Sequence, residues 1–475
     1  MPARESKIWH HLLVSLLCLV LLSEQPARSL PLTELPANDP LAVAPSLASQ
    51  QLDSLTTRIA DKELELLRLN TYFRIESTER GRLKPWRVFL WNLAGAGASN
   101  AGIITVAAER WRTWERPRTA SRHTLKAGPM MLLIGHSILV GGLLLEATLD
   151  TIKDHQIRKK GFDPKTSKKR ALALRDEIDR LMREREELLD RSPDLSDSDR
   201  ELATQESKVL RDVRDVALIE YSQFYARAVG RRWSRNASYL NGLAAASTGG
   251  YLGALGGLIA VCARRPSVAG PAGIGFILSG SHIAAAPVVG RVTAKLGAKR
   301  ARGQISKELG VLSATSAEKF DSDREELKRA SSALPASTFS PGLTARLAVY
   351  DSQDSIFAAQ AAMNAGEKKK ADRAFLERLF WNSAIGGTKI AWGTLLSYAG
   401  FRYYNYPRRF SKSIAQGSTC FVVGTGFFIL DTLQAHTRSE RDVYAMGLQQ
   451  ALPHQKLQAR LSKLDELDAM LKRSQ

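Results

Sequence analysis

Nearly uncharged stretches of about 20 residues alternate along this chain with longer stretches that are rich in charge. As helices, such stretches are long enough to cross the hydrocarbon core of a bilayer. Buried helices of a soluble protein can be equally apolar, but six stretches of near-spanning length favour a membrane protein. The pattern therefore predicts an all-α, polytopic fold with spans at residues 88–108, 127–145, 237–263, 266–290, 379–401 and 413–430.

The six stretches form three close pairs, and the pairs resemble one another. Each pair opens at an asparagine and turns at a proline 25 residues later: Asn92 with Pro117, Asn241 with Pro266, and Asn382 with Pro407. A helix of that length covers about 37 Å, which is a hydrocarbon core plus one interface. The constant spacing predicts three repeated helical hairpins. We place the repeat units at 50–195, 196–335 and 336–475, and their hairpins at 88–152, 237–290 and 379–435.

The segments between the hairpins are rich in Ala, Leu, Glu, Lys and Arg, which favour helix. Apolar side chains recur there at steps of three and four residues: Leu172, Ile178, Leu181, Met182, Leu461, Leu464, Leu467 and Leu471. Because such a stripe must be buried, we expect these amphipathic helices to pack as a bundle outside the membrane. Breaks are expected near residues 161–164, 192–193 and 335–341, where Gly, Ser and Pro gather.

The N-terminus carries a targeting pattern. Residues 1–29 combine a charged start, an apolar run from Leu12 to Leu22 and a small-residue end, which predicts a cleaved signal peptide. An uncleaved anchor is the alternative. A disordered, proline-rich spacer is expected at residues 30–49. A cleaved signal followed by six spans places the termini and the long charged segments outside and the hairpin tips in the cytoplasm, although basic residues occur on both sides.

The net charge of +20 over 475 residues suggests an anionic partner. A secretory start and membrane spans argue against nucleic acid and favour the bilayer, with anionic lipid headgroups as partners. The three cysteines, Cys18, Cys262 and Cys420, lie inside apolar runs, so neither a disulfide framework nor a cysteine zinc site is expected. No cofactor motif is found, and we expect no cofactor or metal.

Polar side chains inside the predicted spans are costly in lipid and are therefore the candidate functional residues. Asn92, Asn241 and Asn382 are expected near the outer ends of the spans. There they either form a ring around a pseudo-threefold axis or, as we prefer, bond neighbouring helices.

Two further sets of polar residues lie within the hairpins. Lys389 and Asp431 differ in depth by about 9 Å across the third hairpin, a gap that the long lysine side chain can narrow. We expect a structural ion pair, with a proton relay as the alternative. His136 and His282 lie in the return helices of the first two hairpins. Isolated histidines on apolar faces more often form hydrogen bonds in a core than bind a metal.

No set of residues supports catalysis. Residues 135–139, GHSIL, approach the Gly-x-Ser-x-Gly pattern of hydrolases, but Leu139 replaces the second glycine. We therefore expect a non-enzymatic envelope protein whose hairpins anchor a helical domain for unidentified envelope partners or self-association. The alternative is a channel or transporter with its path at the pseudo-threefold axis.

Overall fold

The computed structural model describes residues 47–78, 83–193, 195–310, 317–332, 341–448 and 452–473. The expected signal peptide lies outside these ranges, as does the proline-rich spacer except for its last three residues, which belong to a helix rather than to a disordered segment. Of the residues in these ranges 94% are helical, and no strand occurs among them. The expected all-α fold is therefore confirmed.

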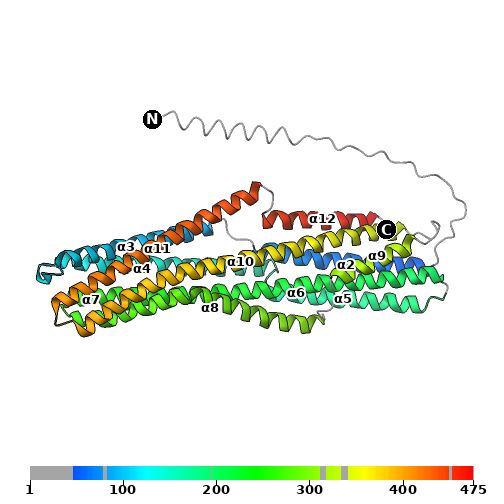
Figure 1. Ribbon diagram of the computed structural model, residues 1–475. Helices are drawn as coiled ribbons and strands as arrows, with labels where there is room; N and C mark the ends of the chain where they lie inside the picture. Colours follow the sequence, from blue (N-terminus) through cyan, green and yellow to red (C-terminus); the bar gives the residue numbers. More distant parts are fainter. Residues whose placement is uncertain are drawn as a thin grey trace, which may run out of the picture. The chain divides into compact units, whose positions relative to one another are not determined.

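The helices follow one another with short connections (Figure 1). In chain order they are α2 (Leu47–Thr78), α3 (Lys84–Thr113), η1 (Pro117–Thr119), α4 (Arg122–Lys159), α5 (Pro164–Asp190), α6 (Asp197–Ser247), the π-helical η2 (Thr248–Ala254), α7 (Leu255–Cys262), η3 (Pro266–Val268), α8 (Ala269–Leu309), α9 (Ala317–Ser332), α10 (Pro341–Arg402), α11 (Pro407–Leu448) and α12 (Pro453–Arg473). Pro117, Pro266 and Pro407 stand at the three turns where the sequence placed the hairpin tips.

The helices that carry the apolar stretches contact one another in a closed order. Helix α3 packs on α4, α4 on the α6–η2–α7 helix, that helix on α8, α8 on α10, α10 on α11, and α11 on α3. We call this arrangement the six-helix ring. Residues from its helices share one apolar core, which includes Ile103, Leu132, Phe276, Trp392 and Phe421.

Glycines let neighbouring helices of the ring approach closely. A Cβ atom at Gly393 of α10 would lie 2.6 Å from the carbonyl oxygen of Gly273 of α8, and a Cβ at Gly386 would lie 2.6 Å from that of Gly280. Real Cβ atoms do not come so close, so a larger residue would push α8 and α10 apart. The small faces therefore serve tight packing.

A second set of helices forms what we call the charged bundle. It comprises α2, α5, α9 and α12 with the N-terminal part of α6, the C-terminal end of α8 and the N-terminal part of α10, and it has an apolar core of its own. The predicted stripes supply part of this core: Ile178, Leu181, Met182, Leu464, Leu467 and Leu471 are buried, while Leu172 and Leu461 are half-buried. The prediction that the stripes bury against one another is confirmed.

Four helices in the described ranges are long and apolar enough to cross a membrane, within Arg122–Asp190, Asp197–Cys262, Pro266–Leu309 and Pro407–Gly447. These contain the second, third, fourth and sixth expected spans. The first and fifth, in α3 and α10, are not among them, because Gly, Ser, Thr and Asn make those segments less apolar.

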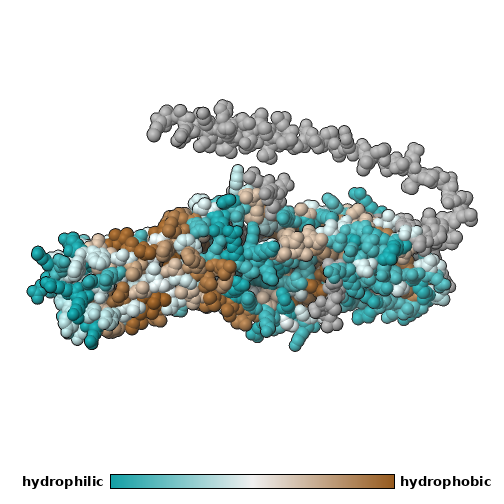
Figure 2. Space-filling model, viewed as in Figure 1, coloured by the Kyte–Doolittle hydropathy of each residue, from teal (hydrophilic) through white to brown (hydrophobic). Residues whose placement is uncertain are grey.

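The exposed surface separates the two parts of the structure. Large hydrophobic side chains are exposed within 83–152, 233–296 and 376–444; outside these ranges the exposed ones in the described chain are Leu47, Tyr72 and Met470. Figure 2 shows the result: a hydrophobic band over the six-helix ring, with hydrophilic surface at the turns and over the charged bundle. A band of this kind is the surface that a bilayer covers.

Candidate functional site

The three asparagines make no hydrogen bond to one another in the described part of the chain. Asn241 of α6 instead pairs with His282 of α8. Its amide donates to the His282 carbonyl oxygen at 2.8 Å, and its Oδ1 lies 3.1 Å from His282 Nδ1. This pair joins two neighbouring helices. Asn92 and Asn382 are half-buried, and an asparagine ring stays a prediction.

Lys389 of α10 and His136 of α4 meet across the six-helix ring. Lys389 Nζ lies 3.0 Å from His136 Nε2, and the two residues are 5% and 3% exposed. The expected pairing of Lys389 with Asp431 was wrong. Asp431 interacts with the charges of Arg378 and Arg438, and Lys389 lies 11 residues beyond Arg378. That is about 16 Å further along α10, too far for one side chain to bridge.

Hydrogen-bond partners fix the state of His136. Its Nδ1 lies 2.8 Å from the carbonyl oxygen of Leu132, which can only accept, so Nδ1 carries the proton. Nε2 then has a free lone pair and accepts from Lys389. The imidazole is neutral in this arrangement, and no carboxylate pairs with Lys389 among the described residues.

Aromatic rings enclose the Lys389 amine. The ring centroids of Phe276 and Phe421 lie 5.9 and 5.6 Å from Nζ, within the range of a cation–π interaction. The indole of Trp392 stacks on Phe421 with centroids 4.5 Å apart and contacts Phe276 at 3.8 Å. These three rings seal the polar pair on one side.

Gly249 leaves the space that the pair occupies. It lies in η2, a π-helical turn of the kind often found at functional sites. A Cβ atom at this position would lie 2.6 Å from His136 Nε2, 2.8 Å from Ser279 Oγ and 2.9 Å from Lys389 Nζ. The local widening of the helix and the missing side chain together accommodate two buried polar groups.

An apolar cavity of about 310 Å³ extends from the aromatic rings toward the turns. Phe276 and Trp392 line its inner end, and Pro117 and Pro266 line the end at the turns. Three arginines, Arg110, Arg122 and Arg264, are also among its lining residues. The basic residues near the turns are visible in the sequence, but nothing there signals a cavity, because its walls come from helices far apart in the chain.

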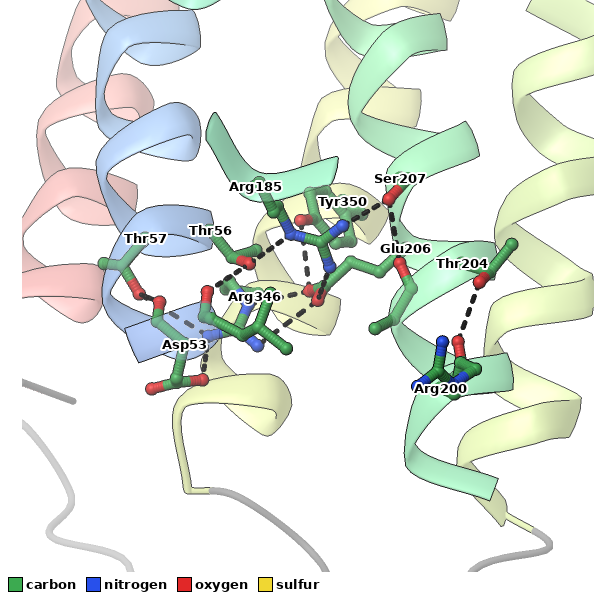
Figure 3. Close-up of polar contacts among 12 residues, drawn as sticks. Asp53, Thr56, Thr57, Arg185, Arg200, Thr204, Glu206, Ser207, Arg346 and Tyr350 are labelled. Atoms are coloured by element: carbon green, nitrogen blue, oxygen red, sulfur yellow. Dashed lines mark hydrogen bonds and ion pairs between the residues drawn. The ribbon is translucent and has the colours of Figure 1, made fainter. Parts of the chain in front are cut away.

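A network of buried charges crosses the charged bundle (Figure 3). Arg346 of α10 donates from Nε to Glu206 Oε1 of α6 at 2.7 Å and pairs with Asp53 of α2. Arg185 of α5 reaches the other oxygen, Glu206 Oε2, at 3.3 Å and donates to Thr56 Oγ1 at 2.7 Å. The Glu206 carboxylate thus joins α6 to α5 and α10, and the two arginines extend the network to α2.

Burial and neighbouring charges shift the pKa values of two groups in this network, Arg346 and Tyr350. Burial opposes the charge on Arg346, but Glu206 and then Asp53 hold the pKa of its guanidinium above its ordinary value. Burial and the Glu206 charge raise the pKa of the Tyr350 hydroxyl well above its ordinary value, so this hydroxyl keeps its proton and donates to Glu206 at 3.4 Å. The network is a fully bonded polar core and lies apart from the cavity residues.

Glu63 of α2 is the exception in the charged bundle. Its side chain is fully buried, and neither carboxylate oxygen has a hydrogen-bond partner in the described chain. Burial raises the pKa of this carboxyl well above its ordinary value, although the charge of Arg214 acts in the opposite direction. Burial therefore favours the neutral form of this carboxyl.

A second ion-pair cluster attaches α12 to the charged bundle. The Glu220 carboxylate of α6 forms ion pairs with two guanidinium groups: Oε1 lies 2.7 Å from Arg460 Nη1 of α12 and 3.1 Å from Arg74 Nη2 of α2. Burial opposes ionisation of Glu220, but Arg460 and then Arg74 lower the pKa of its carboxyl below its ordinary value. Sequence reasoning missed both clusters, because charged residues on an amphipathic helix are normally solvated.

The described ranges contain no group of three or more His, Cys, Asp or Glu residues placed to hold a metal ion. Comparison with known proteins finds no match, whether to a protein family, to a curated protein or to a solved structure.

Proposed function

We propose that this chain is an integral membrane protein with six spans in three repeated hairpins, and that it presents the charged bundle as a non-enzymatic interaction platform outside the bilayer. The observation that carries the proposal is the division of the surface in Figure 2, where the hydrophobic band ends at the charged bundle. A soluble protein does not expose so continuous an apolar surface.

Helical continuity supports a platform rather than a flexible tether. Helix α10 runs for 62 residues from the charged bundle into the six-helix ring, about 93 Å at the usual rise. The helix from Asp197 to Cys262 covers 66 residues and makes the same passage. Uninterrupted helices transmit position and orientation, so a partner bound to the bundle would be held at a fixed height above the membrane.

The closed order of the ring supports the repeat. Each pair of consecutive helices around the ring, α3 with α4, α7 with α8, and α10 with α11, includes one of the proline turns. Three such pairs around one centre are what an internal triplication predicts. Partners of the bundle are envelope proteins or a second copy of the chain, with the turns on the cytoplasmic side and a secretory route to the membrane.

A channel or transporter is the second candidate, and the Lys389–His136 pair favours it. Ionisable residues within spans often mark transport paths, and this pair crosses the centre of the ring. Against this function, aromatic rings and small-residue contacts close the centre around the pair. We therefore rank the platform first.

Two measurements test the proposal. Purified protein in liposomes should leave imposed H⁺, Na⁺ and Cl⁻ gradients decaying at the rate of empty liposomes; faster decay that is lost in Lys389→Met would establish transport instead. Topology is tested with single cysteines at Thr119, Ser267 and Lys412 near the turns and at Ser198 and Ser322 in the charged bundle, all exposed positions, in a background lacking the native cysteines.

With the proposed topology, an impermeant maleimide added to intact cells labels Ser198→Cys and Ser322→Cys only. The turn positions become labelled once the membrane is permeabilised. Labelling of all five positions in intact cells would show that the hairpins do not cross the membrane and would overturn the proposal.

A further inference from the structure

We propose that the cavity between the turns and the aromatic rings binds one anionic phospholipid, with one of its acyl chains in the cavity and the phosphate among Arg110, Arg122 and Arg264. This inference rests on the proposal that the hairpins cross a membrane. It goes beyond a general attraction to anionic headgroups, because it assigns a specific site with a defined tail pocket and head pocket.

The tail pocket is apolar and ligand-sized. Its volume of about 310 Å³ lies at the lower end of the range for small-molecule sites. Leu125, Leu396 and Ile414 line its walls, and Phe276 and Trp392 close its inner end. Apart from the Trp392 indole NH, which has no hydrogen-bond partner in the described chain, these side chains are apolar, and an acyl chain would fill the space with favourable contacts.

The three arginines of the head pocket have no carboxylate partner within the described chain. Arg110 donates to Ser411 Oγ at 3.0 Å and lies over the Phe410 ring. Arg122 donates to the carbonyl oxygen of Cys262 at 2.8 Å. Arg264 makes no ion pair with any described residue. These bonds place the guanidinium groups without an ion pair, although the charge of the adjacent Glu109 acts on Arg110.

The surroundings offer the arginines little negative charge. Between residues 221 and 307 the sequence contains no Asp or Glu, and between 378 and 430 it contains none either. Glu109, at the end of α3, is already bound by Arg112 at 2.9 Å and by the Ser121 amide. Helix α4 begins at Arg122 with no acid in its first turn, so its positive end adds to the field. A phosphate group would supply the missing charge.

Arg264 provides independent support, because its backbone is strained. Its φ of 55° is left-handed, a conformation that costs a non-glycine residue about 1–2 kcal/mol. The turn is a Schellman cap, in which the Arg265 amide bonds to the Ala260 carbonyl at 3.1 Å, and glycine is the usual residue at such a position. An arginine at this strained position points to a role for its side chain.

This strain supplies a variant that separates binding from folding. Arg264→Gly removes one head-pocket charge while fitting the turn better, so the variant should melt at the same temperature or higher. Arg122→Gln removes a second charge, and Arg118→Gln, on the exposed neighbouring turn outside the cavity, is its matched control. Ala260→Leu fills the tail pocket, and Ala108→Leu adds the same bulk on an exposed face of α3.

The measurement is native mass spectrometry of the detergent-purified full chain, titrated with phosphatidylglycerol, phosphatidylcholine or inorganic phosphate. We expect one phosphatidylglycerol per chain, phosphatidylcholine bound at least tenfold more weakly, and no competition from inorganic phosphate at equal concentration. Arg264→Gly and Arg122→Gln should each weaken phosphatidylglycerol binding about tenfold. Ala260→Leu should abolish it, and both controls should bind as the parent chain does.

Three results would overturn the inference. Equal binding of phosphatidylglycerol and phosphatidylcholine would show that the arginines do not select for an anionic headgroup. Unchanged binding in Arg264→Gly and Ala260→Leu would show that the lipid binds elsewhere. Competition by inorganic phosphate would make this a site for a free anion. Membrane extraction separates these outcomes from failure of the proposed function: a chain released by carbonate washing is not an integral protein, whatever it binds.

Discussion

Lys389 and His136, 253 residues apart in the sequence, share a hydrogen bond of 3.0 Å at the centre of the six-helix ring. The lysine has an acceptor but no counterion among the described residues. The only N–H of the neutral histidine donates to the Leu132 carbonyl oxygen. Burying an amine without an opposite charge is costly, and one hydrogen bond recovers only part of that cost. The pair is therefore not expected to contribute favourably to the stability of the folded protein.

This asymmetry predicts opposite effects for the two partners. Lys389→Met removes the buried amine and should raise the melting temperature in detergent or leave it unchanged. His136→Leu leaves Lys389 without an acceptor and should lower stability by about 1–3 kcal/mol. The double variant should regain what His136→Leu loses. Equal destabilisation by both single substitutions would contradict this account, because it would mean that the hydrogen bond between the two side chains stabilises the fold.

Gly249 should be intolerant of even one methyl group. In Gly249→Ala the added Cβ would meet His136 Nε2, Ser279 Oγ and Lys389 Nζ, all closer than 3.0 Å. Overpacking of a tight core typically costs about 1–3 kcal/mol, so we expect a clear loss of thermal stability. Gly97, on the same ring, has open space where a Cβ atom would lie, with nothing within 4 Å, and Gly97→Ala is the control. A loss in both variants would point to backbone effects instead.

The Glu206 network predicts a large penalty for a half-removed ion pair. Arg346→Met leaves Glu206 with Arg185 and the Tyr350 hydroxyl and should cost about 3–5 kcal/mol, because the buried carboxylate loses its closer ion-pair partner. Hydrogen exchange of α2, α6 and α10 amides should report this loss within the charged bundle. Thr204→Ala, an exposed position on α6 next to the network, should leave exchange unchanged.

The helices, the breaks near 161–164 and 192–193 and the proline turns were predictable because they depend on local pattern, whereas the break expected near 335–341 lies outside the described residues except for Pro341. Ile178 and Leu464 lie on apolar stripes, and stripes are buried wherever a bundle forms. The partner of Lys389 was not predictable, since depths can be compared from the sequence only within one hairpin. To identify His136 as this partner, one must know the order of the helices around the ring, and no spacing in the sequence gives that order.

The proposed repeat shows where sequence reasoning stops. Residues 55–60, LTTRIA, align with 343–348, LTARLA, so Arg58 and Arg346 occupy equivalent positions. In the structure Arg58 is exposed, whereas Arg346 is 4% exposed and binds Glu206. Similar segments entered different packing environments, because the neighbours that bury Arg346 come from α5 and α6. Burial of charge follows the tertiary neighbours, not the local segment.

Glu63 gives the charged bundle a specific dependence on pH. Its pKa in the folded protein is raised above 4.5, the ordinary value, so the fold keeps a proton that the unfolded chain releases. The contribution of Glu63 to stability is therefore most favourable below pH 4.5 and declines as pH rises toward the folded pKa. Glu63→Gln should remove this decline.

The comparison is made by hydrogen exchange of α2 at about pH 5 and about pH 8, on either side of neutrality, corrected for intrinsic rates. Near neutral pH, Glu63→Leu should stabilise the bundle by about 1–3 kcal/mol, since it removes an unbonded buried polar group. Glu220→Gln is the opposing control: the pKa of Glu220 is lowered, so its contribution is present above its unfolded pKa and is lost on acidification. A Glu63→Gln protein with the parent pH profile would contradict this account.

The asparagines at the start of the three hairpins distinguish helix bonding from a ring. Asn241→Leu removes the two bonds to His282 and should lower the melting temperature in detergent, at a cost of about 1 kcal/mol typical for interhelical hydrogen bonds in membranes. Asn382→Leu breaks no side-chain bond seen in the described chain and should have little effect. A functional ring would respond differently, because each member contributes one ligand to a shared centre. In that case substitution of Asn92, Asn241 or Asn382 alone would impair the same activity to a similar degree. If the three substitutions instead have unequal effects on stability and no shared effect on activity, the role of Asn241 is to bond α6 to α8.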